Sequence, residues 1–363
     1  MKRWISDKWV FDSPNWTFLI VTVLLSGFLF LVLHKTYIRG VFDLTNWPQG
    51  SGKLTEKFAT ELSLSPTVDT KMGVQQQRIL YPTLVYIAAF GSPAFVPALL
   101  VFINYICLCV MAWISGVYAQ SLMRHALWGV LIPLYPGFLT SLRSYSPEIL
   151  EVCFLIGSLL CLRRSRHILA TVLLSLAVLA KESALLMVIA AAAVFVFELR
   201  RSEKTIRWFY FTIPLTIFAI WEAILFKIRG DLPLRINQHE IGAPLVGFVR
   251  LFKAAFAGND ASVFTIVPLI ALVVLLAVVL FEMRTAALQR HEKAALWLYG
   301  CWVFCLNGYV FNADLDFLRA SSEFYLIAIT VVLVGTIHGR IAIARDVVLL
   351  WFCYAASLAR PFF

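Results

Sequence analysis

The residues of this 363-residue chain that are able to do chemistry are a few carboxylates and basic side chains set among long apolar runs. Asp43 is one of them, in the polar sequence YIRGVFDLTNW that follows the first apolar run. A carboxylate in such a loop can act as a general base towards a hydroxyl group. The alternative is that Asp43 is an ordinary loop acid in contact with solvent.

Acidic side chains also stand where the sequence SLRSYSPEILEV enters an apolar run, just after Arg143. Pro147 fits the first turn of a helix, and Glu148 favours the positive end of that helix. Glu151 follows one turn later on the same face, at a depth where a membrane makes an ionisable group costly. These residues indicate either a polar site or only a favourable helix start.

Lys181 and Glu182 interrupt two apolar runs in the sequence LAVLAKESALL. Ionisable groups inside a membrane are rare and usually functional. The alternative is a structural pair in which the two neighbours neutralise each other. Glu222, in AIWEAILF, is a weaker candidate because it lies four residues from the end of its run and can reach the interface.

An Asp-x-Asp pattern, Asp314 and Asp316, precedes Arg319. Two carboxylates at this spacing are able to hold a divalent cation such as Mg²⁺ or Mn²⁺, although the pattern also occurs by chance. The basic tract 228–258 suits a phosphate or an anionic acceptor, or else is a solvated loop. The HExxH, GxSxG, CxxC and Gly-rich phosphate-binding motifs are absent from the sequence, so zinc hydrolase, triad hydrolase and nucleotide-binding readings have no support.

The composition is that of a membrane protein. Apolar residues make up 61% of the chain and charged residues 14%, with a mean hydropathy of +0.82, which is outside the range of soluble proteins. Basic residues that flank membrane spans set topology and contact anionic lipid, so the net charge of +10 does not predict a nucleic-acid partner. The seven cysteines lie in apolar runs, which favours buried thiols over disulfides.

The apolar runs predict an all-α polytopic membrane protein, a single transmembrane domain over residues 1–363 with about 11 transmembrane helices. The predicted spans are 16–33, 95–118, 127–140, 149–162, 168–180, 183–197, 208–226, 262–281, 294–311, 324–337 and 347–359. The dense Lys and Arg residues of the short connectors predict that the N-terminus is inside. The predicted inside segments are 1–15, 119–126, 163–167, 198–207, 282–293 and 338–346.

This topology leaves two long loops outside the membrane, 34–94 and 227–261. The first contains the apolar run 79–90, which is 12 residues long, whereas a crossing needs roughly 20. We therefore predict an interfacial helix there that does not span the membrane. A polar loop beside an interfacial helix is a suitable place for a site.

The run QQQRILYPTLVYIAAFGSPAFVPALLVFINYICLCVMAW, residues 75–113, resembles bacterial membrane proteins of cell-surface glycopolymer formation in the C-type glycosyltransferase superfamily (GT-C). Such proteins often carry the pattern Y-Q-R-x-x-Y-P-L-L-x-W-L-L-x-x-G. The residues that match it are Gln77, Arg78, Tyr81, Pro82 and Gly91. The order of SLRSYSPE, LRRSRH and LAKES also fits. The resemblance covers about residues 39–199, and the rest of the chain only by hydropathy.

The resemblance implies a GT-C-like enzyme of the bacterial cytoplasmic membrane that works on the extracytoplasmic face. Its donor is a polyprenyl-phosphate-linked sugar that enters from the membrane lipid, and its acceptor is a glycan, lipid or protein. The sugar moves by direct displacement at its anomeric carbon, with a carboxylate orienting or deprotonating the acceptor hydroxyl. A lipid-linked donor needs no nucleotide site, which agrees with the sequence.

The resemblance also suggests roles for residues of this chain. Asp43 is the expected catalytic carboxylate, with Asp69 and Glu148 as substitutes. The expected ligands of the donor phosphate are Arg78, Lys181 and Arg319. The expected substrate-binding residues are Gln77, Tyr81, Arg143 and Glu182.

The chain departs from the family pattern at two places. Relatives commonly have Asp-Gly-Gln-x-Tyr after the first span, where this chain has Asp43-Leu44-Thr45-Asn46-Trp47. The usual acid four residues before Glu148 is Ser144 here. These departures leave open a divergent acceptor or a member that has lost catalysis. The other classes of function that remain are a transporter or flippase of lipid-linked sugars, a polysaccharide polymerase or ligase, and a non-catalytic membrane subunit.

Overall fold

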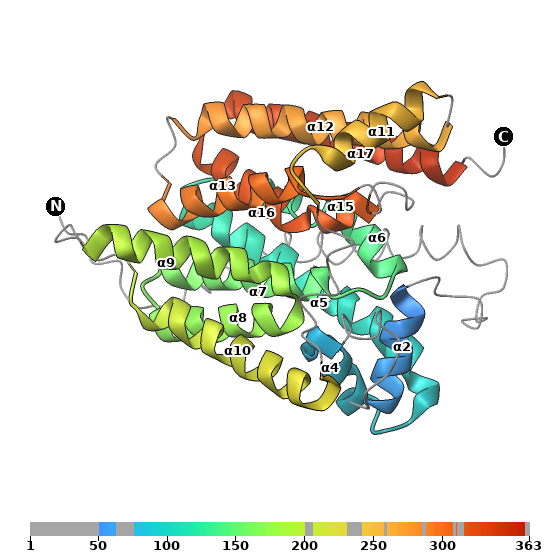
Figure 1. Cartoon of the computed structure of the whole chain (residues 1–363). Helices are drawn as coiled ribbons and strands as arrows, with labels where there is room; N and C mark the ends of the chain where they lie inside the picture. The colour runs from blue at the N-terminus through green and yellow to red at the C-terminus, as the bar shows by residue number, and fades with distance from the viewer. Residues whose placement is uncertain are drawn as a thin grey trace.

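The computed structural model describes residues 51–62, 76–199, 206–230, 242–257, 260–284, 288–307, 310 and 316–359. This part of the chain is helical and contains no strand, which confirms the all-α prediction (Figure 1). The predicted first span, 16–33, and the loop acids Asp43 and Asp69 lie outside the described residues.

The chain order begins with short helices and continues with long apolar ones. The helices before residue 200 are α2 (Ser51–Glu61), α4 (Leu80–Ala88), η2 (Pro93–Phe95), α5 (Val96–Ser121), η3 (Ala126–Leu131), α6 (Gly137–Arg143), α7 (Glu148–Arg163), α8 (His167–Ala180), η4 (Glu182–Ala184) and α9 (Leu185–Leu199). The later ones are α10 (Phe209–Arg229), α11 (Val246–Phe256), α12 (Asp260–Glu282), α13 (Arg290–Phe304), α15 (Asp316–Ala320), α16 (Ser322–Val334) and α17 (Ile337–Ala359).

Three segments of the described chain are helical, long and apolar enough to cross a membrane: Pro93–Ser121, Glu182–Leu199 and Phe209–Ile228. Three shorter helices are also apolar: His167–Ala180, Ile266–Glu282 and Ser322–Val334. Helices of this length and composition are those of a membrane protein. The count of about 11 spans stays a prediction.

Two predicted spans are wrong as single helices. The helix in the predicted span 294–311, α13, already ends at Phe304, and residues 305–307 are not helical. Residues 127–140 fold as the 3₁₀ helix η3, a turn, and then the start of α6. The reason is the sequence IPLYPG between them, because Pro133 and Pro136 lack the N–H groups that a continuous helix needs. The predicted division of 168–197 into two helices is confirmed, with the break at Lys181.

The segment after Arg78 forms α4, a helix of nine residues. At about 1.5 Å per residue its length is roughly 13 Å, less than half the thickness of the apolar layer of a bilayer. The helix by itself is therefore too short to span a membrane, and its place along the membrane surface stays a prediction. Its buried side packs on α2 and α5, while Ile87 and Phe90 at its end are 63% and 96% exposed.

Two helices lie at the centre of the bundle. The side chains of α16 are buried on every side from Ser322 to Leu333, and those of α7 almost as completely. A helix that is apolar all round belongs in the interior. On one side α11, α12 and α17 pack as a layer, and on the other α8, α9 and α10 do so (Figure 1).

One end of the bundle is held by paired charges. Arg163, at the end of α7, donates to both carboxylate oxygens of Glu292 on α13, at 2.9 and 2.6 Å. The hydroxyl of Tyr118, near the end of α5, donates to the same carboxylate at 2.8 Å. Arg290 pairs with Glu198 of α9 at 3.3 Å. We call this the Arg163 end.

The remaining connectors at this end join through backbone contacts. Arg124, just after α5, donates to the carbonyl oxygen of Leu333 at 3.1 Å. Glu282, at the end of α12, accepts hydrogen bonds from the backbone and hydroxyl of Thr336 at 2.8 and 2.6 Å. These contacts place four of the segments that were predicted inside, 119–126, 163–167, 198–207 and 282–293, at one end of the bundle. Which face of the membrane that end meets stays a prediction.

A labelling experiment tests the sidedness. We expect single cysteines introduced at Lys57 of α2 and at Ser165, in a chain whose seven native cysteines are replaced, to react with an impermeant maleimide from opposite sides of the membrane. Both positions are exposed, and they belong to opposite predicted faces. The measurement is labelling of intact cells before and after permeabilisation. Reaction of both positions from one side would contradict the topology.

Candidate functional site

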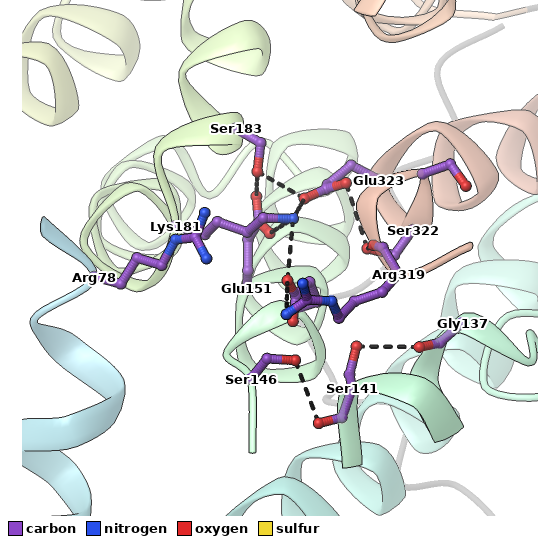
Figure 2. A network of polar contacts seen from close by, with 12 residues as sticks. Arg78, Gly137, Ser141, Ser146, Glu151, Lys181, Ser183, Arg319, Ser322 and Glu323 are labelled. Atoms are coloured by element: carbon purple, nitrogen blue, oxygen red, sulfur yellow. Dashed lines mark hydrogen bonds and ion pairs between the residues drawn. The ribbon is translucent and has the colours of Figure 1, made fainter. Parts of the chain in front are cut away.

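Seven charged side chains gather at the end of the bundle where α7, η4 and α16 begin. Figure 2 labels Arg78, Glu151, Lys181, Arg319 and Glu323 among them. Each of them is at most 13% exposed, and Glu151 is fully buried. We call them the buried charge cluster. Its members are Arg78, Glu148, Glu151, Lys181, Glu182, Arg319 and Glu323.

Lys181 is at the centre of the cluster. Its Nζ atom lies 2.5 Å from Oε1 of Glu323, 3.6 Å from Oε1 of Glu148 and 3.7 Å from Oε2 of Glu151. The ammonium group therefore joins α16 to two successive turns of α7. Figure 2 shows the side chains of Glu151, Glu323 and Ser183 around it.

Arg78 and Glu182 form the second pair. The Nε and Nη2 atoms of Arg78 donate to the two carboxylate oxygens of Glu182 at 2.9 and 2.5 Å. This two-bonded geometry is the strongest that an arginine and a carboxylate adopt. It fixes the segment before α4 against the junction of α8 and α9, although the two residues are 104 positions apart.

The junction itself explains why the neighbours Lys181 and Glu182 have different partners. Lys181 has an extended backbone, with φ −159° and ψ 138°, between the last turn of α8 and η4. Lys181 then contacts α7 and α16, whereas Glu182 contacts Arg78. The alternative that the two mainly neutralise each other does not match these contacts.

All four acids of the cluster lie in the first turns of helices. Glu148 and Glu151 lie in the first turn of α7, Glu182 starts η4, and Glu323 lies in the first turn of α16. Each helix start presents unsatisfied N–H groups and a partial positive charge, which stabilises a nearby anion by about 0.3–1 kcal/mol at exposed sites. The cluster is thus a place where helix starts as well as cations favour negative charge.

A tight loop positions Glu148. The backbone N–H of Ser146 donates to the carbonyl of Ser141 at 3.0 Å, and Tyr145 takes a positive φ of 50° to allow this turn. The side-chain amide of Asn104, on α5, donates to the carbonyl of Ser146 at 3.0 Å. Such bonds satisfy a buried loop and hold the following helix start in place.

Arg319 reaches the cluster from α15. Its Nη1 atom lies 3.6 Å from Oε1 of Glu148. The turn that carries it is anchored by the hydroxyl of Tyr135, which lies 2.8 Å from the carbonyl oxygen of Leu318 and 2.9 Å from the hydroxyl of Ser321. The three cations suggested as phosphate ligands are therefore brought to one place.

The other suggested site residues are only partly brought there. Gln77 is buried next to Arg78, but the hydroxyl of Tyr81 donates to the carbonyl of Leu100 at 2.6 Å and so holds α4 on α5. Arg143 ends α6, and nothing is described of its side chain. The residues that lie outside the described part of the chain are Asp43, Asp69 and Asp314, and nothing is described of the side chain of Asp316.

Two members of the site were not among the predicted site residues. Glu323 and Ser183 both contact the centre of the cluster, through Lys181 and Glu151. Glu323 carries the same signal as Glu148, an acid at the start of an apolar helix, and this signal was available in the sequence. Ser183 had no signal, because a serine at a helix junction is ordinary.

Other polar groups border the cluster. Glu222 on α10 is 6% exposed, and neither carboxylate oxygen has a hydrogen-bond partner among the described residues. The neighbouring Trp221 donates to the carbonyl of Gln76 at 3.2 Å, which places α10 beside Arg78. Within the same part of the chain, no three His, Cys, Asp or Glu residues are arranged to hold a metal ion.

Comparison with protein-family models, with curated proteins and with solved structures found no match to this chain. Chemically, the cluster offers three cations able to bind a phosphate and carboxylates able to accept a proton or a hydroxyl hydrogen bond.

Replacing the central lysine tests the energetics of the cluster. We expect Lys181→Met to destabilise the protein by about 3–5 kcal/mol, because it leaves buried carboxylates without their ammonium partner. The double variant Lys181→Met with Glu323→Gln should be less destabilised than the single one, since it removes the closest unpaired charge. The measurement is thermal unfolding of the purified protein in detergent, with the exposed Lys57→Met as control. Equal stability of Lys181→Met and the wild type would show that the ion pairs contribute nothing.

Proposed function

We propose that this protein is a membrane glycosyltransferase that moves a sugar from a polyprenyl-phosphate donor to an acceptor on the extracytoplasmic face of the bacterial cytoplasmic membrane. The observation that carries the proposal is the buried charge cluster. It brings Arg78, Lys181 and Arg319 together beside Glu148, within an apolar helical bundle and at the end opposite the Arg163 end. Arg78, from the run 75–113, meets Glu148 and Lys181, from the sequences SLRSYSPE and LAKES, in this cluster.

The cluster suits a phosphate that is attached to lipid. Arginine binds phosphate through paired N–H groups, and the helix starts at Glu148 and Glu323 add partial positive charge. Each cation is already paired with a carboxylate, so an arriving phosphate must replace one of these contacts. Arg319 lies 3.6 Å from Glu148, the described carboxylate nearest to it in the cluster. We therefore assign Arg319 to the phosphate site together with Arg78 and Lys181.

The reaction that fits this site is a displacement at the anomeric carbon of the donor sugar. The acceptor oxygen forms the new glycosidic bond as the bond from carbon to the phosphate oxygen breaks, and the electron pair of that bond leaves with the lipid phosphate. The proton of the acceptor hydroxyl passes to a carboxylate. Asp43 is the proposed base, with Asp69 as a substitute from the same loop.

Glu148 is the described carboxylate best suited to replace Asp43 in this role. Its Oε1 atom faces Lys181 and Arg319, whereas Oε2, which is also buried, has no hydrogen-bond partner among the described residues. A buried carboxylate oxygen without a donor is costly, and an incoming hydroxyl group satisfies it. The acceptor itself is a glycan, a lipid or a protein.

Transfer assays test the proposal. We expect protein in vesicles to transfer sugar from a panel of polyprenyl-phosphate sugars, and Asp43→Asn to lower the rate by about 10²–10⁴-fold, because the amide cannot accept the proton. Glu148→Gln should lower it by a similar factor only if Glu148 is the base. Product formation is followed by mass spectrometry. Wild-type protein that moves the donor across the vesicle without transfer would instead indicate a transporter.

Donor binding gives a separate prediction. We expect Arg319→Met to weaken binding of a polyprenyl phosphate by about tenfold or more, since a charge-assisted contact to phosphate is typically worth about 1.5–3 kcal/mol. The matched control is Arg164→Met, an exposed arginine at the Arg163 end. Binding is measured as the rise in unfolding temperature with added lipid phosphate. Equal binding by both variants would remove Arg319 from the phosphate site.

A further inference from the structure

In the interior of the buried charge cluster, one serine lies between two carboxyl groups. The Oγ atom of Ser183 is 2.9 Å from Oε1 of Glu151 and 2.7 Å from Oε1 of Glu323 (Figure 2). Both distances are those of hydrogen bonds. A serine hydroxyl has one hydrogen, so it can donate to only one of the two oxygens. If both groups were carboxylates, the other contact would be repulsive.

A charge count points the same way, and it does not depend on the serine. Among the described residues, the cluster has three cations, Arg78, Lys181 and Arg319, and four carboxyl groups. An unbalanced charge in an apolar interior is strongly unfavourable, and the usual escape is that one group takes up or releases a proton. One protonated carboxyl group makes this described set of charges neutral.

We propose that Glu151 binds this proton, and that Glu151, Ser183 and Glu323 form a hydrogen-bonded chain that positions the ammonium group of Lys181. In this chain Oε1 of Glu151 donates to Oγ of Ser183, and the serine hydroxyl donates to Oε1 of Glu323. The ionised Glu323 then accepts from Lys181. Every contact at Ser183 has one donor and one acceptor.

The distances to Lys181 decide which carboxyl group holds the proton. Its Nζ atom lies 2.5 Å from Glu323, the length of a direct ammonium–carboxylate bond, but 3.7 Å from Glu151. Glu323 also lies within 3.4 Å of the Ser322 hydroxyl, which favours its charged form. Glu151 lies in the first turn of its own helix, as Glu323 does, but its distance to Nζ is 3.7 Å and its side chain is fully buried.

The groups that face Glu151 and Glu323 from neighbouring elements do not change which of the two holds the proton. Glu148 faces it from the preceding turn of α7, and Arg319 of α15 lies against Glu148. The hydroxyl of Tyr299, on α13, donates to the backbone carbonyl of Ser183 at 3.2 Å and so fixes the serine rather than the acids. Ser183 and Glu323 are thus positioning residues for Lys181.

The proposal does not rest on the proposed function, because its test needs neither donor nor acceptor. The test is infrared spectroscopy of the purified full-length protein in lipid, since a protonated carboxyl group has a C=O band separate from that of carboxylates. We expect a difference band between the wild type and Glu151→Gln, shifted by exchange into D₂O. Glu222→Gln and a variant of a partly buried acid on α17, Asp346→Asn, are recorded beside it, so that bands of these other acids are subtracted.

Thermal unfolding supplies the second measurement. Glutamine is a neutral isostere of a protonated glutamic acid, so Glu151→Gln should keep the wild-type unfolding temperature. Glu323→Gln removes the closest partner of Lys181, so it should lower that temperature by several degrees. In this variant Glu151 should also lose its proton to replace Glu323, which removes the infrared band.

Several outcomes would overturn the proposal. A band that survives in Glu151→Gln assigns the proton to another group. A Glu151→Gln protein that unfolds as early as Glu323→Gln, or that does not fold, shows that Glu151 is needed as a charge. A band that persists unchanged in Glu323→Gln breaks the link between Glu151 and Lys181.

Discussion

The structure depends on the pairing of charges that an apolar bundle would otherwise exclude. An unpaired ammonium or carboxylate in such an interior costs several kcal/mol, so each must have a partner and each partner must stay in place. Lys181 has its partner on α16, and Arg78 has one at the junction of α8 and α9. The positions of α4, α7 and α16 follow from these contacts as much as from apolar packing.

The two ends of the bundle use charge differently. At the Arg163 end, Glu292 takes two bonds from one arginine and one from Tyr118, and Arg124 binds carbonyls at the end of α16. These bonds satisfy helix ends that would otherwise remain unpaired. At the cluster the acids stand at helix starts and share their cations, and one carboxylate oxygen of Glu148 accepts no hydrogen bond from the described residues.

Much of the fold could be predicted from the sequence, because long apolar runs form helices wherever water is excluded. The prediction of a span over 127–140 was wrong because it followed length and hydropathy, whereas Pro133 and Pro136 interrupt the helix. For the site, the structure brings Glu148, Lys181 and Arg78 into one cluster, but their partners could not be derived from the sequence. Glu323 is 142 residues from Lys181, and no local pattern states which helices meet.

That separation has a consequence for how the protein is made. At about 5–20 residues per second, Glu323 leaves the ribosome roughly 7–28 seconds after Lys181. During this time the lysine already has Glu148 and Glu151 on the preceding helix, at 3.6 and 3.7 Å in the finished protein. The hairpin of α7 and α8 thus enters the membrane with its own counter-charges. Once α16 is made, Glu323 replaces Glu148 and Glu151 as the closest partner of Lys181.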